Sequence, residues 1–112
     1  MTETKEMKVI LVGPDEDGLG DALADEGVEV SHIEEVANRP ALEEAGITEA
    51  DALVLTETEG ATAIPIAKDL NADVQVVVYT EQTLPDFARG QADLIVDPQL
   101  LSAQAVAEEL AA

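Results

Sequence analysis

The sequence contains no cysteine and no tryptophan, and aromatic residues make up only 2% of its 112 residues. Without cysteine, the chain can form no disulfide, no thiolate nucleophile and no cysteine-based metal site. Its apolar runs stay short of the roughly 18–20 residues that a membrane-spanning helix requires. The start, Met-Thr-Glu-Thr-Lys-Glu, has no signal-peptide character. We therefore expect a cytoplasmic protein without membrane insertion.

Positive charge is equally scarce. Five Lys and Arg residues stand against 25 Asp and Glu residues, so the formal net charge is −20. Repulsion of this size destabilises a compact chain unless salt screens it, and at molar salt the Debye length is about 3 Å. The acidic, lysine-poor and alanine-rich composition is typical of a halophilic protein with solvated cations at its surface. The lack of a basic patch disfavours nucleic acid as a partner.

Acidic chains with few aromatic residues can remain disordered, but regular apolar segments favour a folded chain here. We expect one domain over residues 1–112, with a flexible N-terminus at 1–6. The hydrophobic pattern predicts strands at 7–13, 28–33, 52–56, 74–79 and 93–96. Predicted helices lie at 17–26, 40–45, 61–70, 84–89 and 98–111, the last one capped by Asp97 and started by Pro98.

This strict alternation predicts an α/β, three-layer, Rossmann-like domain with a five-stranded parallel sheet and helices on both faces. We prefer the strand order 3-2-1-4-5, and 2-1-3-4-5 stays open. Ligands of such sheets bind beyond the carboxyl ends of the strands, near the switch in strand order. The loops of interest are therefore 13–18, 34–39, 56–60, 80–83 and 97–99.

The first of these loops lies where a dinucleotide-binding fingerprint belongs. Gly13 and Gly18 match the first and third glycines of G-x-G-x-x-G, but the middle position holds Asp15. A carboxylate there repels the pyrophosphate that the glycine would admit. Glu34, about twenty residues on, takes the place of the acid that binds the ribose in dinucleotide-binding domains.

Three later segments make the chain resemble the TrkA-N, or RCK N-terminal, domain of potassium-transport regulators. They are Ala50-Asp-Ala-Leu-Val-Leu-Thr, Ile66-Ala-Lys-Asp-Leu-Asn-Ala-Asp-Val-Gln-Val-Val-Val and Ala92-Asp-Leu-Ile-Val-Asp-Pro-Gln-Leu-Leu. The resemblance implies a Rossmann fold that binds NAD or an adenine nucleotide and pairs with itself. By position, Gly13 and Gly18 would face the phosphates, Glu34 the ribose, and Thr56 to Glu59 the adenosine.

The chain is also similar to short haloarchaeal proteins of undefined function, some of them labelled CTP synthetase. A glutamine-dependent synthetase needs a cysteine nucleophile and a phosphate-binding loop. The sequence has no cysteine, and its phosphate loop is acidic. The residues therefore give that label no support.

Two functional hypotheses follow, and an enzyme is a third and weaker one. The first is a non-catalytic, stand-alone, Rossmann-like domain that works by regulatory contacts, as a homodimer or with a protein partner. The alternative is a nucleotide-sensing module for NAD or an adenine nucleotide, bound by Gly13, Asp15, Gly18, Glu34 and Thr56. We identify no catalytic residue and no metal site.

Other patterns give weaker hypotheses. Asp15, Asp17 and Thr80 resemble part of the acidic pocket of phosphoacceptor receiver domains, but the third predicted strand ends Val-Leu-Thr-Glu, without an acceptor aspartate, and Asp97-Pro98 replaces the expected Lys-Pro. A hard cation on the acidic loop is a further alternative. His32 has no ligand partner at a suitable spacing. Residues 56, 58, 62 and 102 are predicted helix caps.

The acidic loop has one further interpretation, which concerns Asp15. A carboxylate at the head of a helix can satisfy the N–H groups and the dipole that a phosphate would otherwise satisfy. Residues 13–18 are then a self-capped turn that needs no ligand.

Overall fold

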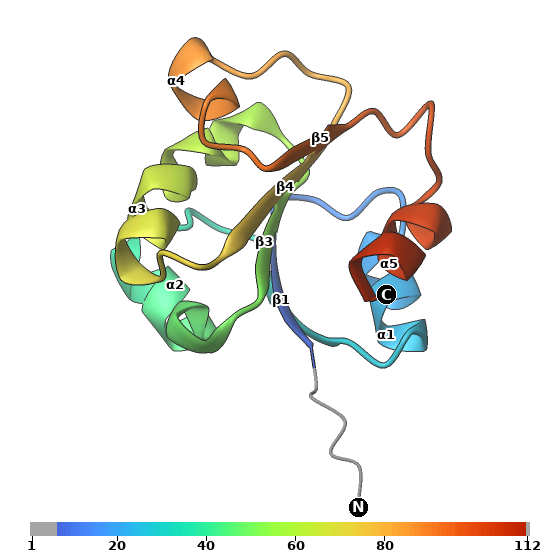
Figure 1. Ribbon diagram of the computed structural model, residues 1–112, viewed down its shortest axis with the longest axis horizontal. Coiled ribbons are helices and arrows are strands. Elements are labelled where there is room, and N and C mark those ends of the chain that lie inside the picture. Colours follow the sequence, from blue (N-terminus) through green and yellow to red (C-terminus); the bar gives the residue numbers. More distant parts are fainter. Residues whose placement is uncertain (1–6, 112) are drawn as a thin grey trace, which may run out of the picture.

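The computed structural model describes residues 7–111. Five parallel strands form one sheet in the order β2-β1-β3-β4-β5. Helices α1 and α5 cover one face of the sheet, and α2, α3 and α4 cover the other (Figure 1). The elements are β1 (Lys8–Val12), α1 (Leu19–Asp25), β2 (Glu29–Ile33), α2 (Arg39–Ala45), η1 (Ile47–Glu49), β3 (Ala52–Leu55), η2 (Thr58–Thr62), α3 (Ala63–Leu70), β4 (Gln75–Tyr79), α4 (Asp86–Arg89), β5 (Leu94–Val96) and α5 (Ala103–Ala111).

The predicted fold class is confirmed, but the preferred strand order 3-2-1-4-5 is wrong. In the structure β3 pairs with β1 on one side and with β4 on the other, and β2 lies at the edge. Burial explains this order. All four residues of β3 are buried, whereas β2 exposes Glu29 and His32. A fully apolar strand is stable inside the sheet, and a partly polar strand is stable at its edge.

Two hydrophobic clusters, one on each face, hold the sheet between its helices. Alternate residues of the inner strands belong to opposite clusters, because successive strand side chains point to opposite faces. Ile10 and Leu53 belong to the cluster under α2, α3 and α4. Leu11 and Val54 belong to the cluster under α1 and α5. The near-continuous apolar run predicted for the first strand is thus explained by burial on both faces.

The start of α5 differs from the prediction. The helix begins at Ala103, not at Pro98, and the Ser102 hydroxyl accepts a hydrogen bond from the Ala105 N–H at 3.1 Å. Asp97 instead accepts the Gln99 N–H at 2.8 Å, which forms a turn before the helix. Ser102 is therefore confirmed as a cap. The hydroxyls of residues 56, 58 and 62 make no capping bond in the structure.

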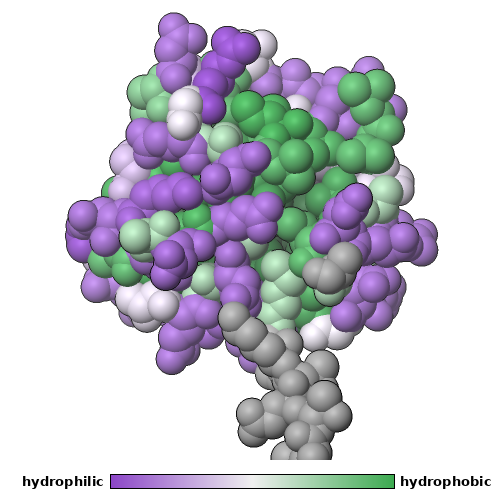
Figure 2. All heavy atoms as spheres, in the orientation of Figure 1, coloured by the Kyte–Doolittle hydropathy of each residue, from purple (hydrophilic) through white to green (hydrophobic). Residues whose placement is uncertain are grey.

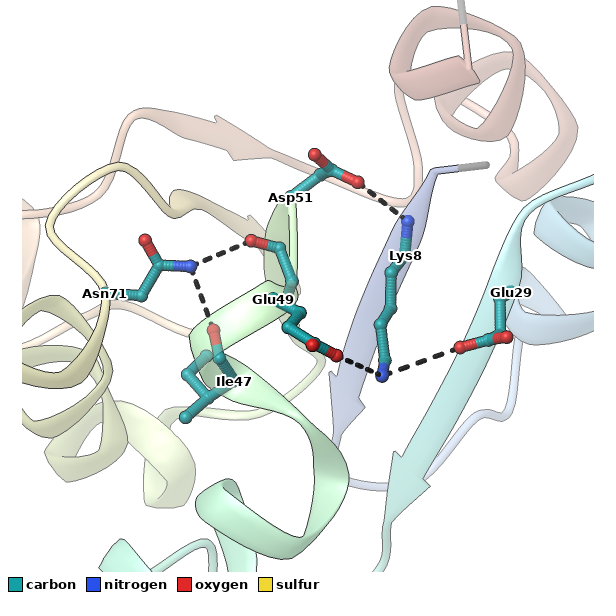
Figure 3. Close-up of polar contacts among 7 residues, drawn as sticks. Lys8, Glu29, Ile47, Glu49, Asp51 and Asn71 are labelled. Carbon is teal, nitrogen blue, oxygen red and sulfur yellow. Dashed lines mark hydrogen bonds and ion pairs between the residues drawn. The ribbon is translucent and has the colours of Figure 1, made fainter. Parts of the chain in front are cut away.

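The amino end of the sheet is held by contacts of Lys8. Its N–H donates to Asp51 Oδ2 at 2.8 Å, and its Nζ lies 3.6 Å from Glu29 Oε2 and 4.0 Å from Glu49 Oε2 (Figure 3). One residue of β1 thereby contacts β2, η1 and the residue just before β3. In a chain with so few cations, this lysine neutralises part of a local excess of carboxylates.

A second contact at this end of the sheet involves η1, a short helix that the sequence pattern did not predict. The Asn71 side-chain amide donates to the carbonyls of Ile47 and Ala50, both at 2.9 Å. These carbonyls lie in and just after η1. The bonds join the end of α3 to the entry of β3, and the Ile47 carbonyl also accepts the Ala50 N–H at 3.2 Å.

None of the helices within residues 7–111 is long and apolar enough to cross a membrane. The expected flexibility of residues 1–6 lies outside the described residues, and a single domain over 1–112 stays a prediction.

Gly46 offers a test of this local packing. It ends α2 in the left-handed conformation, with φ of 91°, and an added Cβ would meet the end of the Lys8 side chain. We expect Gly46→Ala to lower the free energy of unfolding by about 1–2 kcal/mol, because a Cβ is strained at positive φ. Urea denaturation followed by circular dichroism in molar KCl measures this loss.

The matched control is Gly90→Ala. Gly90 also follows a helix, but its φ is −73° and no atom lies within 4 Å of an added Cβ. Its unfolding free energy should stay the same or rise slightly, since alanine restricts the unfolded chain. Equal losses in the two variants would contradict the assignment of the effect to positive φ.

Candidate functional site

The residues proposed from the sequence lie along the carboxyl edge of the sheet. Gly13 and Asp15 follow β1, Glu34 follows β2, and Thr56 follows β3, while Gly18 is the residue before α1. Gly13 has φ of 107°, and a Cβ added there would meet the Thr56 hydroxyl. The fold thus brings the turn after β1 directly against the end of β3, where no side chain fits on Gly13.

Asp15 caps α1. Its Oδ1 accepts the Leu19 N–H at 2.7 Å and its Oδ2 accepts the Gly20 N–H at 2.9 Å. Gly18 turns the chain into the helix with φ of 75°. Gly20 lets the carboxylate approach, because an added Cβ would lie 2.9 Å from Asp15 Oδ2. The self-capped turn predicted from the sequence is confirmed.

This cap changes what the loop can bind. The two N–H groups that would cradle a phosphate at the head of a helix already donate to Asp15. The exposed carboxylates of Glu16 and Asp17 follow directly and add negative charge. Within residues 7–111, no group of three or more acidic or histidine side chains is arranged to hold a metal ion. The hypothesis that the acidic loop binds a hard cation therefore gains no support from the geometry of these residues.

The ends of β3, β4 and β5 carry Thr56, Thr80 and Asp97. The Thr56 hydroxyl donates to the Val12 carbonyl at 3.2 Å. Thr80 is buried, and its hydroxyl accepts the Gln82 N–H at 3.2 Å. Asp97 accepts the Gln99 N–H. Each of these three side chains thus makes a hydrogen bond within the chain, at a turn or at a strand end.

A hollow of about 260 Å³ lies beside this edge, near the switch in strand order between β1 and β3. Four glutamates line it, two after β2 and two after β3: Glu34, Glu35, Glu57 and Glu59. Glu34, the predicted ribose-binding acid, has an exposed side chain whose Oε1 lies 3.9 Å from His32 Nδ1. The electrostatic field of four carboxylates disfavours an anionic ligand in this hollow.

His32 has a structural contact. Its Nε2 lies 2.6 Å from the Gly13 carbonyl oxygen, which can only accept, so this nitrogen carries the hydrogen. The contact ties the edge strand β2 to the start of the β1–α1 turn. The histidine therefore helps to hold the loop that Asp15 closes.

No sequence pattern indicated the role of Tyr79, which is the one tyrosine of the chain. Its hydroxyl donates to the Leu101 carbonyl at 2.8 Å and its ring is buried. Burial first, and then the negative charge of Asp17, raise the pKa of Tyr79 above its ordinary value of 10.0. The general rule that a buried tyrosine hydroxyl has a hydrogen-bond partner would have predicted such a bond, but not that the partner is Leu101.

Comparison with known proteins decides the family of this chain. The profile of a family of unknown function, DUF7126, matches residues 9–110. The chain belongs to this family. No curated protein matches the sequence.

Several solved structures similar to the DUF7126 chain are response regulators. HP1043, an orphan response regulator of H. pylori, has a TM-score of 0.71 and 16% identity over 93% of this chain and 92% of its own. An atypical orphan response regulator, described with a phosphorylation-independent regulatory mechanism, has a TM-score of 0.69 and 17% identity over 92% and 91%. A Burkholderia pseudomallei response regulator with a phosphorylated aspartic acid, calcium ion and citrate has a TM-score of 0.63 and 18% identity. The match covers 94% of this chain and 71% of that protein.

These findings correct the family and function expected from the sequence. The TrkA-N or RCK resemblance is wrong, because the similar folds are receiver domains. The two functions expected from the sequence, a stand-alone Rossmann-like regulatory domain and a nucleotide-sensing module, are wrong for the same reason. Parallel α/β domains of different families share apolar strands followed by a turn and a helix. The three segments that resembled TrkA-N domains therefore indicated the fold class but not the family. The receiver resemblance holds for the fold of the chain.

The cap predicts a stability effect. We expect Asp15→Ala to lower the free energy of unfolding by about 1–2 kcal/mol, because two N–H groups at the head of α1 lose their acceptor. Thermal and urea denaturation measure the change. Glu16→Ala is the matched control, since it removes the same charge from an exposed neighbour. A loss no greater than that of the control would contradict the role of the cap.

The raised pKa of the Tyr79 phenol can be tested by titration. Its absorbance reports one phenol, since the chain has no tryptophan and no other tyrosine. We expect the midpoint to lie above 10.0 and Asp17→Asn to lower it, because a negative neighbour disfavours the phenolate. A raised folded pKa adds stability below the unfolded pKa, and this stability is lost as the pH rises through the folded value. Asp21→Asn, an exposed change of equal charge on α1, should leave the midpoint nearer that of the parent chain. Equal shifts would contradict the assignment.

Proposed function

We propose that this DUF7126 chain is a receiver-like signalling domain that works without phosphorylation, in a salt-adapted protein. The fold supports the signalling class, since response regulators are among the structures similar to this chain. The observation that carries the proposal is the end of β3, where a phosphoacceptor would be a carboxylate. This position holds Thr56, whose hydroxyl donates to a strand carbonyl.

Two other positions support the same proposal. The first acidic residue after β1 is Asp15, and both of its oxygens accept N–H groups at the head of α1. The residue after β5 is Asp97, where a receiver has a lysine, and a negative charge there would repel a phosphoryl group. One of the similar proteins is described with a phosphorylation-independent mechanism, which shows that this fold can regulate in that way.

Phosphotransfer tests the proposal directly. The full chain is incubated with acetyl phosphate and Mg²⁺ in KCl, and its intact mass is measured beside a phosphorylatable receiver domain in the same buffer. We expect the mass of the chain to stay unchanged while the control gains one phosphoryl group. Addition of a phosphoryl group to the chain would contradict the proposal.

The variant Thr56→Asp sharpens this experiment, because it restores a carboxylate after β3. We expect it to stay unmodified as well, since Asp15 remains engaged in the cap and Asp97 remains negative. Phosphorylation of Thr56→Asp would show that the rest of the phosphotransfer site works, against the proposal.

The salt adaptation predicts a gain of structure with salt. A chain with a net charge of −20 should fold cooperatively as KCl rises from about 0.1 M to molar concentrations, because screening removes repulsion. Circular dichroism measures the midpoint. The pair Glu57→Gln and Glu59→Gln, from the acidic hollow, should lower it more than Glu108→Gln with Glu109→Gln on α5. Full stability at low salt would contradict the salt adaptation.

A further inference from the structure

A glutamine side chain joins the turn after β3 to the turn after β4. Gln82 Oε1 accepts the Thr58 N–H at 2.8 Å and the Thr58 hydroxyl at 3.0 Å. The N–H of Gln82 donates to the Thr80 hydroxyl at 3.2 Å, which anchors the glutamine at the end of β4. The two turns lead to η2 and to α4 at the carboxyl end of the sheet (Figure 1). We call the contact between Thr58 and Gln82 the strap.

The strap is a neutral contact at the surface of the molecule. Gln82 is exposed and Thr58 is half-buried, so water competes for both hydrogen bonds. The net contribution of such a bond to stability is small, and salt does not screen it directly because neither partner is charged. Exposed contacts of this kind open locally far more often than the whole domain unfolds. The strap is therefore weak enough for its charged neighbours to decide whether it forms.

The residues next to the strap in the sequence are glutamates. Thr58 lies between Glu57 and Glu59, and Gln82 follows Glu81. The strap therefore brings together two turns that both carry negative charge, and its opening lets these charges move apart. Figure 2 shows hydrophilic side chains over much of the face drawn in Figure 1, as expected for a chain with a net charge of −20.

The acidic hollow adds to this repulsion. Glu57 and Glu59 line it together with Glu34 and Glu35, which follow β2, and none of the residues that line it is a lysine or an arginine. On the other side, Arg89 lines a small hollow with Gln82, but its Nη1 lies 3.8 Å from Asp86 Oδ1. The strap thus holds a turn whose two glutamates face like charge on both sides.

The size of the hollow makes the repulsion depend on salt. A sphere of about 260 Å³ is roughly 8 Å across, so charges on its walls are separated by a distance of that order. This separation is shorter than the Debye length of about 10 Å at 0.1 M salt and longer than that of about 3 Å at 1 M. The repulsion across the turns is therefore strong in dilute salt and screened in molar salt, while the neutral strap keeps its strength.

We propose that the strap is an ionic-strength switch: it is closed in molar salt and opens as the salt concentration falls, while the rest of the domain stays folded. Opening releases the turn that carries Glu57 and Glu59, and with it one wall of the hollow near the switch in strand order. The salt concentration thereby sets the shape of the carboxyl edge. This inference goes beyond the phosphorylation-independent role and does not rest on it, because no phosphoryl group takes part.

Amide hydrogen exchange of the Thr58 N–H, measured by NMR on the full chain at constant pH, reports the strap directly. The KCl concentration is raised to the molar range from the lowest value at which circular dichroism shows the native fold. We expect the protection of Thr58 to rise about tenfold. The reference is the Ala105 N–H, which donates to the Ser102 hydroxyl at 3.1 Å on α5 and should change by less than about twofold. A constant Thr58 protection, or equal changes at both amides, would overturn the proposal.

Variants of the acceptor identify the strap as the source of this protection. Gln82→Ala removes the acceptor, so Thr58 should exchange rapidly at every KCl concentration. Gln82→Glu keeps an acceptor oxygen but adds a charge, so closure should need more KCl than in the parent chain. The matched control is Gln91→Ala, which changes another glutamine of the loop that follows α4, whose amide contacts the Phe87 carbonyl at 3.4 Å. Protection of Thr58 that survives Gln82→Ala would overturn the strap.

Charge variants test the cause of the opening. Glu57→Gln with Glu59→Gln should keep Thr58 protected at the lowest KCl concentration and flatten the salt dependence, because the repulsion is removed and the strap is not. Glu108→Gln with Glu109→Gln on α5 removes the same charge elsewhere and should leave the dependence in place.

Exchange of the β3 amides in the same spectra reports unfolding of the whole domain. An equal effect of the two charge pairs, or a Thr58 protection that follows the β3 amides, would overturn a local switch. These outcomes are independent of phosphotransfer, so either proposal can fail while the other stands.

Discussion

The carboxylate of Asp15 bonds to the N–H groups of Leu19 and Gly20, and the carboxyl edge of the sheet depends on this contact. It starts α1, whose buried Leu19 and Leu23 pack on the sheet beside α5. It also occupies the head of the helix, where a Rossmann domain holds a phosphate and where a receiver directs an acid to its metal. The N–H groups at the head of α1 are therefore already bonded within the chain.

Electrostatics and burial divide the rest of the molecule. The acidic hollow near β1 and β3 combines four glutamates, and the edge strand β5 is apolar and exposes Leu94 and Ile95. Anionic ligands are repelled from the first region, while the second keeps apolar area in water.

Much of the fold followed from the sequence. The buried segment 52–55 is apolar, the segment 74–79 is rich in valine, and Gly46 ends a helix as expected. Errors arose where several structures satisfy the same local pattern. Asp97 and Pro98 suit a helix start, but the chain forms a turn and begins α5 after Ser102. The family resemblance failed for a similar reason, since Ala-Asp, an apolar strand and Pro describe many parallel sheets.

The sequence alone determined the alternation of strands and helices, the negative surface and the cap by Asp15, because each depends on residues close together in the chain. Only the tertiary structure decided the strand order, the contact of Gly13 with Thr56, the bond from Tyr79 to Leu101 and the exposure of β5. These features depend on which strands become neighbours. Strand pairing is set by the total burial of the sheet and its helices, and no local segment encodes that sum.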